Sequence, residues 1–182
     1  MEPRSLPEVL ESERLVLRCP RTEDAPAVLA AIRESFDELH AWMPWAEHLP
    51  SLDEQHRHVR DSRRRFEARE DFAFYLFERA GGDFVGGSGL HRIDWSVPRF
   101  EIGYWLRTSR RGRGYAAEAA RALAAVAFER LGAERVEIRT DTRNERSRRV
   151  AEAAGFELEG VLRRDARQLG ALRDTAVYAR IR

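Results

Sequence analysis

The chain has 182 residues, of which 43% are hydrophobic. This length and apolar fraction suffice for one α/β domain with a sizeable core, and we expect a single domain over residues 1–182. The 32 basic residues, all arginine, nearly balance 31 acidic ones. The net charge of +1 therefore excludes the general positive field by which proteins bind nucleic acid nonspecifically.

Other residue counts exclude further classes of protein. Cys19 is the only cysteine, so a disulfide framework and a Cys-based metal site are excluded within one chain. The five histidines share no metal-ligand spacing, and we expect no metal. The sequence has no signal peptide and no apolar stretch near ~20 residues, so we expect a cytoplasmic protein that does not enter a membrane.

The first part of the chain is expected to form one strand and two helices. Arg14–Arg18 alternates as a short strand does, and Thr22 caps a helix that reaches about His40. Ser51 to Glu54 is a capping box that opens a second helix, which ends near Arg69. The segment Trp42–Trp45 between the two helices is expected to be a loop.

Three strands are expected to follow. Phe72–Arg79 is apolar on both alternating sets of positions, which indicates a strand covered on both faces. Ala80–Asp83 is typical of a hairpin turn and leads into a strand over Phe84–Ile93. Arg99–Arg107 is expected to pair beside it.

The last part alternates helices and strands. Alanines at helical spacing predict a helix with an apolar inner face from Ala116 to Ala127. Arg135–Thr142 is expected to be a strand, and Asn144 to cap a helix ending near Gly155. Two strands, at 156–163 and 175–181, complete an α/β layered fold of order β-α-α-β-β-β-α-β-α-β-β.

The most informative motif is Arg111–Ala116, which follows a predicted strand and opens a predicted helix. Glycines let a backbone approach a ligand closely, and the free N–H groups of a first helical turn attract anions. An ordinary helix cap explains two glycines equally well. A Walker A loop is excluded because the chain has no lysine, and the dinucleotide pattern G-x-G-x-x-G is also absent.

The run R-x-x-G-x-A in Arg111–Ala116 resembles the acetyl-CoA signature of the GNAT N-acetyltransferases. Glu101–Leu106 looks like the fourth strand of that superfamily. Asn144–Ser147, Ala154–Phe156 and Glu159–Gly160 resemble elements of its RimJ/RimL-like branch, which acetylates the N-termini of ribosomal proteins.

The resemblance implies the GNAT fold, a mixed central sheet flanked by helices in which two neighbouring strands splay apart to admit pantetheine. It also implies acetyl-CoA as co-substrate, a primary amine as acceptor and a homodimer. Binding to CoA is expected to use backbone and side-chain atoms of Trp105, Leu106, Arg107, Arg111, Gly112, Arg113, Gly114, Tyr115, Ala116, Asn144 and Ser147.

Further arginines near the turn, Arg110, Arg148 and Arg149, suit the phosphates of CoA, although runs of charge are as often solvated surface. Asn144 serves as a helix cap as well as a ligand in this interpretation.

Acyl transfer to an amine needs a proton acceptor and a proton for the leaving thiolate. The resemblance implies Glu101 as general base, with a structural ion pair as the alternative, and Ser147 as the hydrogen-bond donor to the thiolate. Tyr104 is the second choice of acid, because strand alternation places it opposite Glu101, where core packing explains it. Covalent catalysis by Cys19 is disfavoured, since no base pattern lies nearby.

The acceptor is less well specified. Trp42, Trp45 and His91 are the expected pocket residues, although the tryptophans fit core packing equally well. Ala166 and Arg167 stand where RimL-like enzymes carry a glutamate and an aromatic residue.

We therefore expect transfer to a protein N-terminal α-amine, possible acceptors also being polyamines, amino acids and aminoglycosides. A non-catalytic acyl-CoA-binding protein is the alternative from another class. RNA binding through the arginine clusters is disfavoured by the net charge and by the lack of aromatic RNA motifs.

Overall fold

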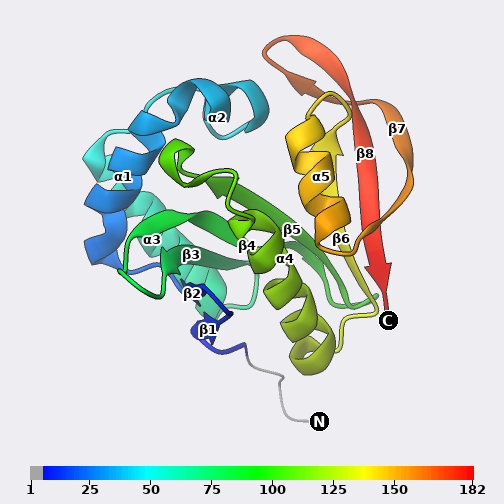
Figure 1. The fold of residues 1–182 in the computed structure, drawn as a ribbon, viewed down its shortest axis with the longest axis horizontal. Coiled ribbons are helices and arrows are strands. Elements are labelled where there is room, and N and C mark those ends of the chain that lie inside the picture. Colours follow the sequence, from blue (N-terminus) through cyan, green and yellow to red (C-terminus); the bar gives the residue numbers. More distant parts are fainter. Residues whose placement is uncertain (1–5) are drawn as a thin grey trace.

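The computed structural model describes residues 6–182. An eight-stranded sheet of order β1-β2-β3-β4-β5-β6-β8-β7 runs through the molecule, with helices on both of its faces (Figure 1). The strands are β1 (Val9–Glu11), β2 (Leu15–Arg18), β3 (Phe72–Glu78), β4 (Phe84–Asp94), β5 (Arg99–Leu106), β6 (Arg135–Asp141), β7 (Glu157–Gln168) and β8 (Ala171–Ile181). The helices are α1 (Ala25–Glu34), α2 (Phe36–Trp42), α3 (Leu52–Glu67), α4 (Tyr115–Val126) and α5 (Glu145–Ala153).

The predicted fold class and order of elements are confirmed, and three local predictions were wrong. The first is the omission of β1, which has three residues and a mostly exposed pattern. So short a segment carries no readable alternation, and it becomes a strand by pairing antiparallel with β2.

The second difference is a break in the first helix. The expected helix to His40 is divided at Ser35, whose φ of −110° and ψ of 8° leave the helical region. The buried Ser35 hydroxyl accepts a hydrogen bond from the Thr108 N–H at 2.9 Å. Serine competes with the helix for local hydrogen bonds, and here its hydroxyl ties the break to the segment that follows β5.

The third difference is the length of the last hairpin, since residues 164–168 and 171–174 also form strands. Its two-residue connection, Leu169 and Gly170, has φ values of 48° and 77°, as a tight hairpin turn requires. The arm was missed because its side chains are mostly exposed and charged, so that no apolar alternation marks it.

Two apolar cores hold the sheet between its helices. The larger lies against α4 and α5, and the predicted inner face of α4 is confirmed because Ala119, Ala120 and Leu123 are fully buried in it. The smaller lies against α1 and α3 and includes Tyr75 and Phe84. Small alanines let α4 approach the strands closely, which brings its N-terminus to the ends of β4 and β5.

The expected splay of two strands is present between β5 and β6. These strands are the sheet's one parallel pair, and their pairing is confined to Arg99–Glu101 with Arg135–Glu137. Beyond Glu101, β5 continues to Leu106 paired with β4 alone. The backbone of 102–106 thus has an edge without a neighbouring strand, with α5 beside it (Figure 1).

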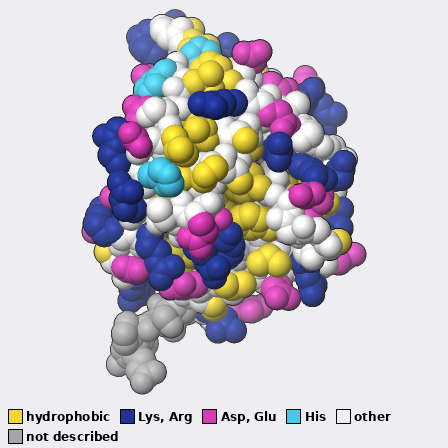
Figure 2. All heavy atoms as spheres, turned by 90° about the vertical axis from the view of Figure 1, so that its left-hand side faces the viewer, with side chains coloured by type: hydrophobic (Ala, Val, Ile, Leu, Met, Phe, Trp, Pro, Cys, Tyr) yellow, Lys and Arg dark blue, Asp and Glu magenta, His cyan; other side chains and the backbone are white. Residues whose placement is uncertain are grey.

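The surface shows mixed charges. Acidic and basic side chains alternate over the face seen in Figure 2, with apolar side chains gathered towards its middle. Within residues 6–182, no helix combines the length and apolar character needed to cross a bilayer.

Candidate active site

A cavity of about 830 Å³ opens where β5 and β6 separate. Its walls come from α2, the end of β5, the turn before α4, the first turn of α4, and α5. It brings together most of the residues predicted from the sequence, namely Trp42, Trp105, Leu106, Arg111, Gly112, Gly114, Tyr115, Ala116, Asn144 and Ser147. Glu101, Arg107, Arg113, Trp45 and His91 lie outside its lining.

The turn before α4 has the backbone conformation of an anion site. Gly112 and Gly114 have φ values of 72° and 79°, which residues with a Cβ atom rarely adopt. The Glu118 N–H donates to the Gly114 carbonyl at 3.0 Å, closing the first helical turn. In the part of the chain that the structure describes, no side chain caps this end of α4. The first-turn N–H groups are therefore open to a bound anion.

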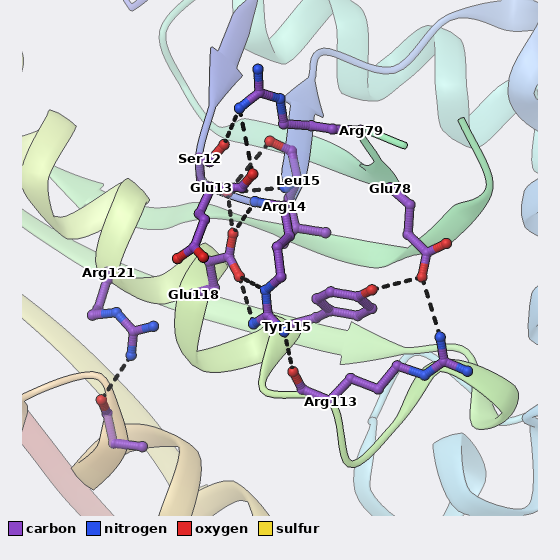
Figure 3. Close-up of polar contacts among 11 residues, drawn as sticks. Ser12, Glu13, Arg14, Leu15, Glu78, Arg79, Arg113, Tyr115, Glu118 and Arg121 are labelled. Atoms are coloured by element: carbon purple, nitrogen blue, oxygen red, sulfur yellow. Dashed lines mark hydrogen bonds and ion pairs between the residues drawn. The ribbon is translucent and has the colours of Figure 1, made fainter. Parts of the chain in front are cut away.

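Polar contacts with the segment that leads into β2 hold the turn in place (Figure 3). Glu118 of α4 accepts hydrogen bonds from the Ser12 hydroxyl and the Arg14 backbone N–H, both at 2.7 Å. The Arg14 guanidinium pairs with the same carboxylate and donates to the Arg113 carbonyl at 2.7 Å. Burial acts to raise the pKa of Glu118, but these hydrogen bonds outweigh it and lower the pKa.

Tyr115 adds a second tie between the turn and the sheet. Its hydroxyl donates to Glu78 of β3 at 2.7 Å, and the Arg14 guanidinium lies 4.8 Å from the centre of its ring. Arg113 also reaches Glu78, at 3.5 Å (Figure 3). The turn is thus fixed by the protein's own contacts.

The arginines near the turn divide into two groups. Arg107 pairs with Glu34 at 2.6 Å, Arg110 with Glu78 and Asp83, and Arg148 donates to the Tyr178 hydroxyl. Arginines 111, 146 and 149 instead line the cavity. The density of arginine in the sequence therefore overstates the positive charge that faces the cavity.

One carboxylate on α2 pairs with two of the three arginines that line the cavity. Glu38 lines the cavity, contacts Arg111, and accepts a hydrogen bond from Arg146 at 2.9 Å. Three segments far apart in the sequence, α2, the turn and α5, therefore meet at one carboxylate.

Two hydroxyl groups meet where α5 faces β5. The Tyr104 hydroxyl lies 2.9 Å from Ser147 Oγ and also donates to the Ser147 carbonyl at 3.0 Å. Asn144 Oδ1 accepts from the Ser147 N–H at 3.1 Å, so the predicted cap is confirmed and it fixes the turn that carries Ser147. Burial raises the pKa of Tyr104 to about 12, so its hydroxyl stays protonated.

The position of Tyr104 was the least anticipated feature of the cavity. Strand alternation correctly places it opposite Glu101, but that face of β5 also lines the cavity. Tyr104 is two residues from Leu106 on β5, so the two side chains point to the same face of the strand. Since Leu106 was expected to bind CoA, this spacing could have identified Tyr104.

Glu101 lies on the other face of β5. Its side chain is 16% exposed, and Oε2 has no hydrogen-bond partner within residues 6–182. Burial raises the pKa of Glu101, and the Arg92 guanidinium 3.4 Å away only partly opposes this.

The remaining predicted acceptor residues are on this same face. The Trp45 ring is 6.0 Å from that of Trp105, and Trp45 is 50% exposed. His91 is opposite Glu101 on β4, and its Nδ1 lies 2.8 Å from Asp71 Oδ2. Among the residues the structure describes, no group of three or more Asp, Glu, His or Cys side chains is placed to hold a metal ion.

Comparison with known proteins agrees with this geometry. The model of the acetyltransferase (GNAT) domain matches residues 14–157. The putative ribosomal N-acetyltransferase YdaF of Bacillus subtilis (strain 168) is 32% identical over 154 residues, covering 84% of this chain and 82% of YdaF. The uncharacterized N-acetyltransferase YoaA of the same strain is 29% identical over 171 residues, covering 94% and 95%.

A solved structure shows the same fold. That of RimL, a ribosomal L7/L12 α-N-protein acetyltransferase in complex with coenzyme A, matches with a TM-score of 0.89 and 24% identity over 96% of this chain and 98% of RimL. The family match covers more than half of the chain, and the splayed strands, the glycine turn and the uncapped helix fit the thioester co-substrate that this family uses. The chain therefore belongs to the GNAT family and is an acetyl-CoA-dependent N-acetyltransferase.

Proposed function

We propose that this enzyme acetylates the α-amine of a protein N-terminus, of the kind found on ribosomal proteins. The observation that carries the proposal is the 32% identity to YdaF, which extends over most of both chains. YdaF is named a putative ribosomal N-acetyltransferase. Several structures with this fold are also named for ribosomal-protein acetylation, one of them for the N-terminal serine of L7/L12.

An α-amine acceptor can be deprotonated by a weaker general base than a lysine side chain requires. An α-amine has a pKa near ~8, compared with ~10.4 for a lysine side chain, so a larger share of it is neutral at pH 7. The bound thioester supplies an activated acetyl group: the amine nitrogen bonds to its carbonyl carbon, the carbon–sulfur bond breaks, the amine loses a proton and the thiolate gains one. The protein has to accept the first proton and provide the second.

Backbone groups of β5 are suited to hold the thioester. The Arg107 N–H is already bonded to the Val85 carbonyl at 2.9 Å. Bonding alternates along an antiparallel ladder, so the N–H of Leu106 is directed away from β4, towards the slot. We propose that this N–H polarises the thioester carbonyl, a role that needs no particular side chain.

The proton for the thiolate comes, in this proposal, from the paired hydroxyls of Ser147 and Tyr104. Both residues line the cavity, and their oxygens are 2.9 Å apart. Since the Tyr104 hydroxyl remains protonated, it replaces the proton that Ser147 gives up.

The amine proton leaves on the other face of β5, where Glu101 was expected to act. Trp105 lies on that face and also lines the cavity beside Trp42 and Met43 of the α2 end, so the two faces communicate at the tip of β5. Gln168 of the β7–β8 hairpin donates to the His40 carbonyl of α2 at 3.0 Å, bridging the elements above that tip. We propose that the acceptor reaches the thioester beneath this bridge.

Free-thiol release from acetyl-CoA tests the proposal. The acceptors are a peptide with N-terminal serine, the same peptide blocked at its α-amine but carrying an internal lysine, a polyamine and an aminoglycoside. Release with the first peptide alone, and an acetyl group located on its α-nitrogen by mass spectrometry, is the expected result. Faster release with a small amine would assign a small-molecule acceptor.

A binding control separates catalysis from mere recognition of the co-substrate. The variant Gly114→Trp places a bulky side chain at a φ of 79° in the turn, and it is expected to lose both acetyl-CoA binding and turnover. Tight binding by the unmodified protein without thiol release on any amine would favour the acyl-CoA-binding alternative and contradict the proposal.

A further inference from the structure

Three rows of residues cross β3, β4 and β5 on the face that carries Trp105. The polar row consists of Asp71, His91 and Glu101, where Asp71 immediately precedes β3 and the other two are register partners. The glycine row is Ala73, Gly89 and Gly103. The aromatic row is Tyr75, Gly87 and Trp105.

The glycine row gives the His91 ring a place to lie. A Cβ atom on Gly89 would be 2.7 Å from His91 Cε1 and 2.8 Å from Nε2, and one on Gly103 would be 3.1 Å from Cδ2. Real Cβ atoms essentially never come as close as the Gly89 distances and rarely come as close as the Gly103 distance, so the imidazole occupies the space above both glycines. The ring therefore leans from the polar row towards Trp105, which lines the cavity.

Asp71 fixes the orientation of that ring. Its side chain is 11% exposed, and Oδ2 lies 2.8 Å from His91 Nδ1. A carboxylate only accepts hydrogen bonds, so Nδ1 carries the proton and the neutral ring has its lone pair on Nε2. The side chain of His91 is 32% exposed, which leaves it reachable by a substrate and by water.

From this geometry we infer that His91 Nε2 is the general base that takes the proton from the acceptor amine, with Asp71 as its positioning residue. The inference rests on the proposed amine acetylation. As the nitrogen–carbon bond forms, the amine proton moves to Nε2. The hydroxyl pair protonates the thiolate and regains a proton from water, and the imidazolium returns its proton to water, so the enzyme gains or loses no proton overall. Glu101, the register partner of His91 on β5, attracts the ammonium form of the acceptor and stabilises the imidazolium.

Several charged groups influence this histidine. Arg65 of α3 lies 3.4 Å from Asp71, and His58 of the same helix is electrostatically coupled to Asp71. Glu101 faces His91 from β5, with Arg92 of β4 beside it, and Glu137 and Arg139 of β6 act on Glu101 in turn. A variant at any of these positions is expected to shift the dependence of kcat/KM on pH. Only a change at His91 itself is expected to remove the step that the base produces in this dependence.

Steady-state kinetics with the N-terminal serine peptide test the assignment. His91→Gln is expected to lower kcat about a hundredfold or more, with acetyl-CoA binding within twofold of the unmodified protein. In a plot of kcat/KM against pH, the fall at low pH (the acidic limb) that comes from protonation of a group on the enzyme should disappear. Asp71→Asn should lower kcat by a smaller factor and change the same limb. His48→Gln, at a side chain 71% exposed, is the matched histidine control and should change neither.

Chemical rescue distinguishes a base from a structural side chain. His91→Ala removes the ring from above Gly89 and Gly103, and added imidazole should restore part of its activity. The proposal is overturned if His91→Gln keeps its rate within threefold, if its loss is neither rescued nor accompanied by a change in the acidic limb, or if Glu101→Gln alone removes that limb.

The tautomer can be measured without turnover. In ¹⁵N-histidine-labelled protein, with His91→Gln used to assign the signal, NMR at neutral pH should show a proton on Nδ1 and none on Nε2. A proton on Nε2 in the neutral ring would exclude the base role. If the unmodified enzyme turned over no amine, the proposed function would fail, and this measurement would still show whether Asp71 leaves Nε2 of His91 free to accept a proton.

Discussion

The Tyr104 hydroxyl and Ser147 Oγ, 2.9 Å apart, join the tip of β5 to the first turn of α5 across the splayed strands. Ser147 lies on a helix outside the sheet. Its hydroxyl can reach Tyr104 because β5 and β6 separate after Glu101. The same separation makes the cavity and places these two hydroxyl groups on its wall.

Removing the tyrosine hydroxyl should slow acetyl transfer without weakening co-substrate binding. Tyr104→Phe keeps the packed ring and deletes one donor, so kcat is expected to fall roughly tenfold to a hundredfold. The pKa of Tyr104 is raised to about 12, so its hydroxyl stays protonated at moderately alkaline pH. The fall in rate at high pH should therefore occur at the same pH in Tyr104→Phe as in the unmodified enzyme.

The double variant tests whether the hydroxyls act as a unit. Ser147→Ala is expected to have a loss similar to that of Tyr104→Phe, and the two changes together should cost less than the product of their separate effects. Strictly multiplicative losses, measured by steady-state kinetics, would mean that the hydroxyls act independently.

The turn glycines should be needed for two separable reasons. Gly114→Ala puts a Cβ at a φ of 79° and 3.4 Å from the Arg14 guanidinium, so we expect a loss of stability of about 1–2 kcal/mol and weaker acetyl-CoA binding. Gly155→Ala, after α5, has a φ of 81° and an unobstructed Cβ. Thermal unfolding should show similar destabilisation in both, and calorimetry should show weaker binding only for Gly114→Ala.

The buried Glu118 should make the turn sensitive to acid. Its folded-state pKa is lowered, so its contribution to stability is present above the unfolded value of about 4.3 and is lost as the pH falls through the folded value. Glu118→Gln should cost about 1.5–3 kcal/mol at pH 7, because the Ser12 and Arg14 donors lose a charged acceptor.

Denaturant unfolding at several pH values checks this prediction. The difference in stability between the unmodified protein and Glu118→Gln should shrink below about pH 4. A difference that stays constant down to pH 3 would show that the carboxylate charge does not hold the turn.

Much of the fold could be predicted because its signals are local. The capping box of Ser51 with Glu54 opens α3 as expected, and both alternating sets of Phe72–Glu78 are largely buried between helices. The extension of the last hairpin and the break at Ser35 could not be predicted. The first depends on strand pairing across a tight turn that no apolar pattern marks, and the second on Thr108, which is 73 positions away in the sequence.

The candidate site was predictable to the same degree. The glycine turn and the Asn144 cap are contiguous motifs, so the sequence shows them directly. The row that places His91 between Asp71 and Glu101 depends on the register of three strands. The sequence shows which residue types are present, but the pairing of β3, β4 and β5 determines which of these side chains lie next to one another.

The last prediction concerns Glu38, whose carboxylate contacts Arg111 and Arg146 inside the cavity. Phosphate groups bound at the turn must compete with it for these guanidinium groups. Glu38→Gln removes the competing charge and keeps the side-chain volume, so the Kd for acetyl-CoA should fall roughly twofold to fivefold, as expected for partly exposed ion pairs.

Glu67→Gln, which removes one of the two carboxylates paired with Arg63 of α3, is the matched control and should leave the Kd unchanged. The difference between the two variants should narrow as salt is raised, since screening weakens exposed ion pairs. Weaker binding by Glu38→Gln in calorimetry would instead mean that the carboxylate holds α2 and the two arginines in the arrangement that the co-substrate needs.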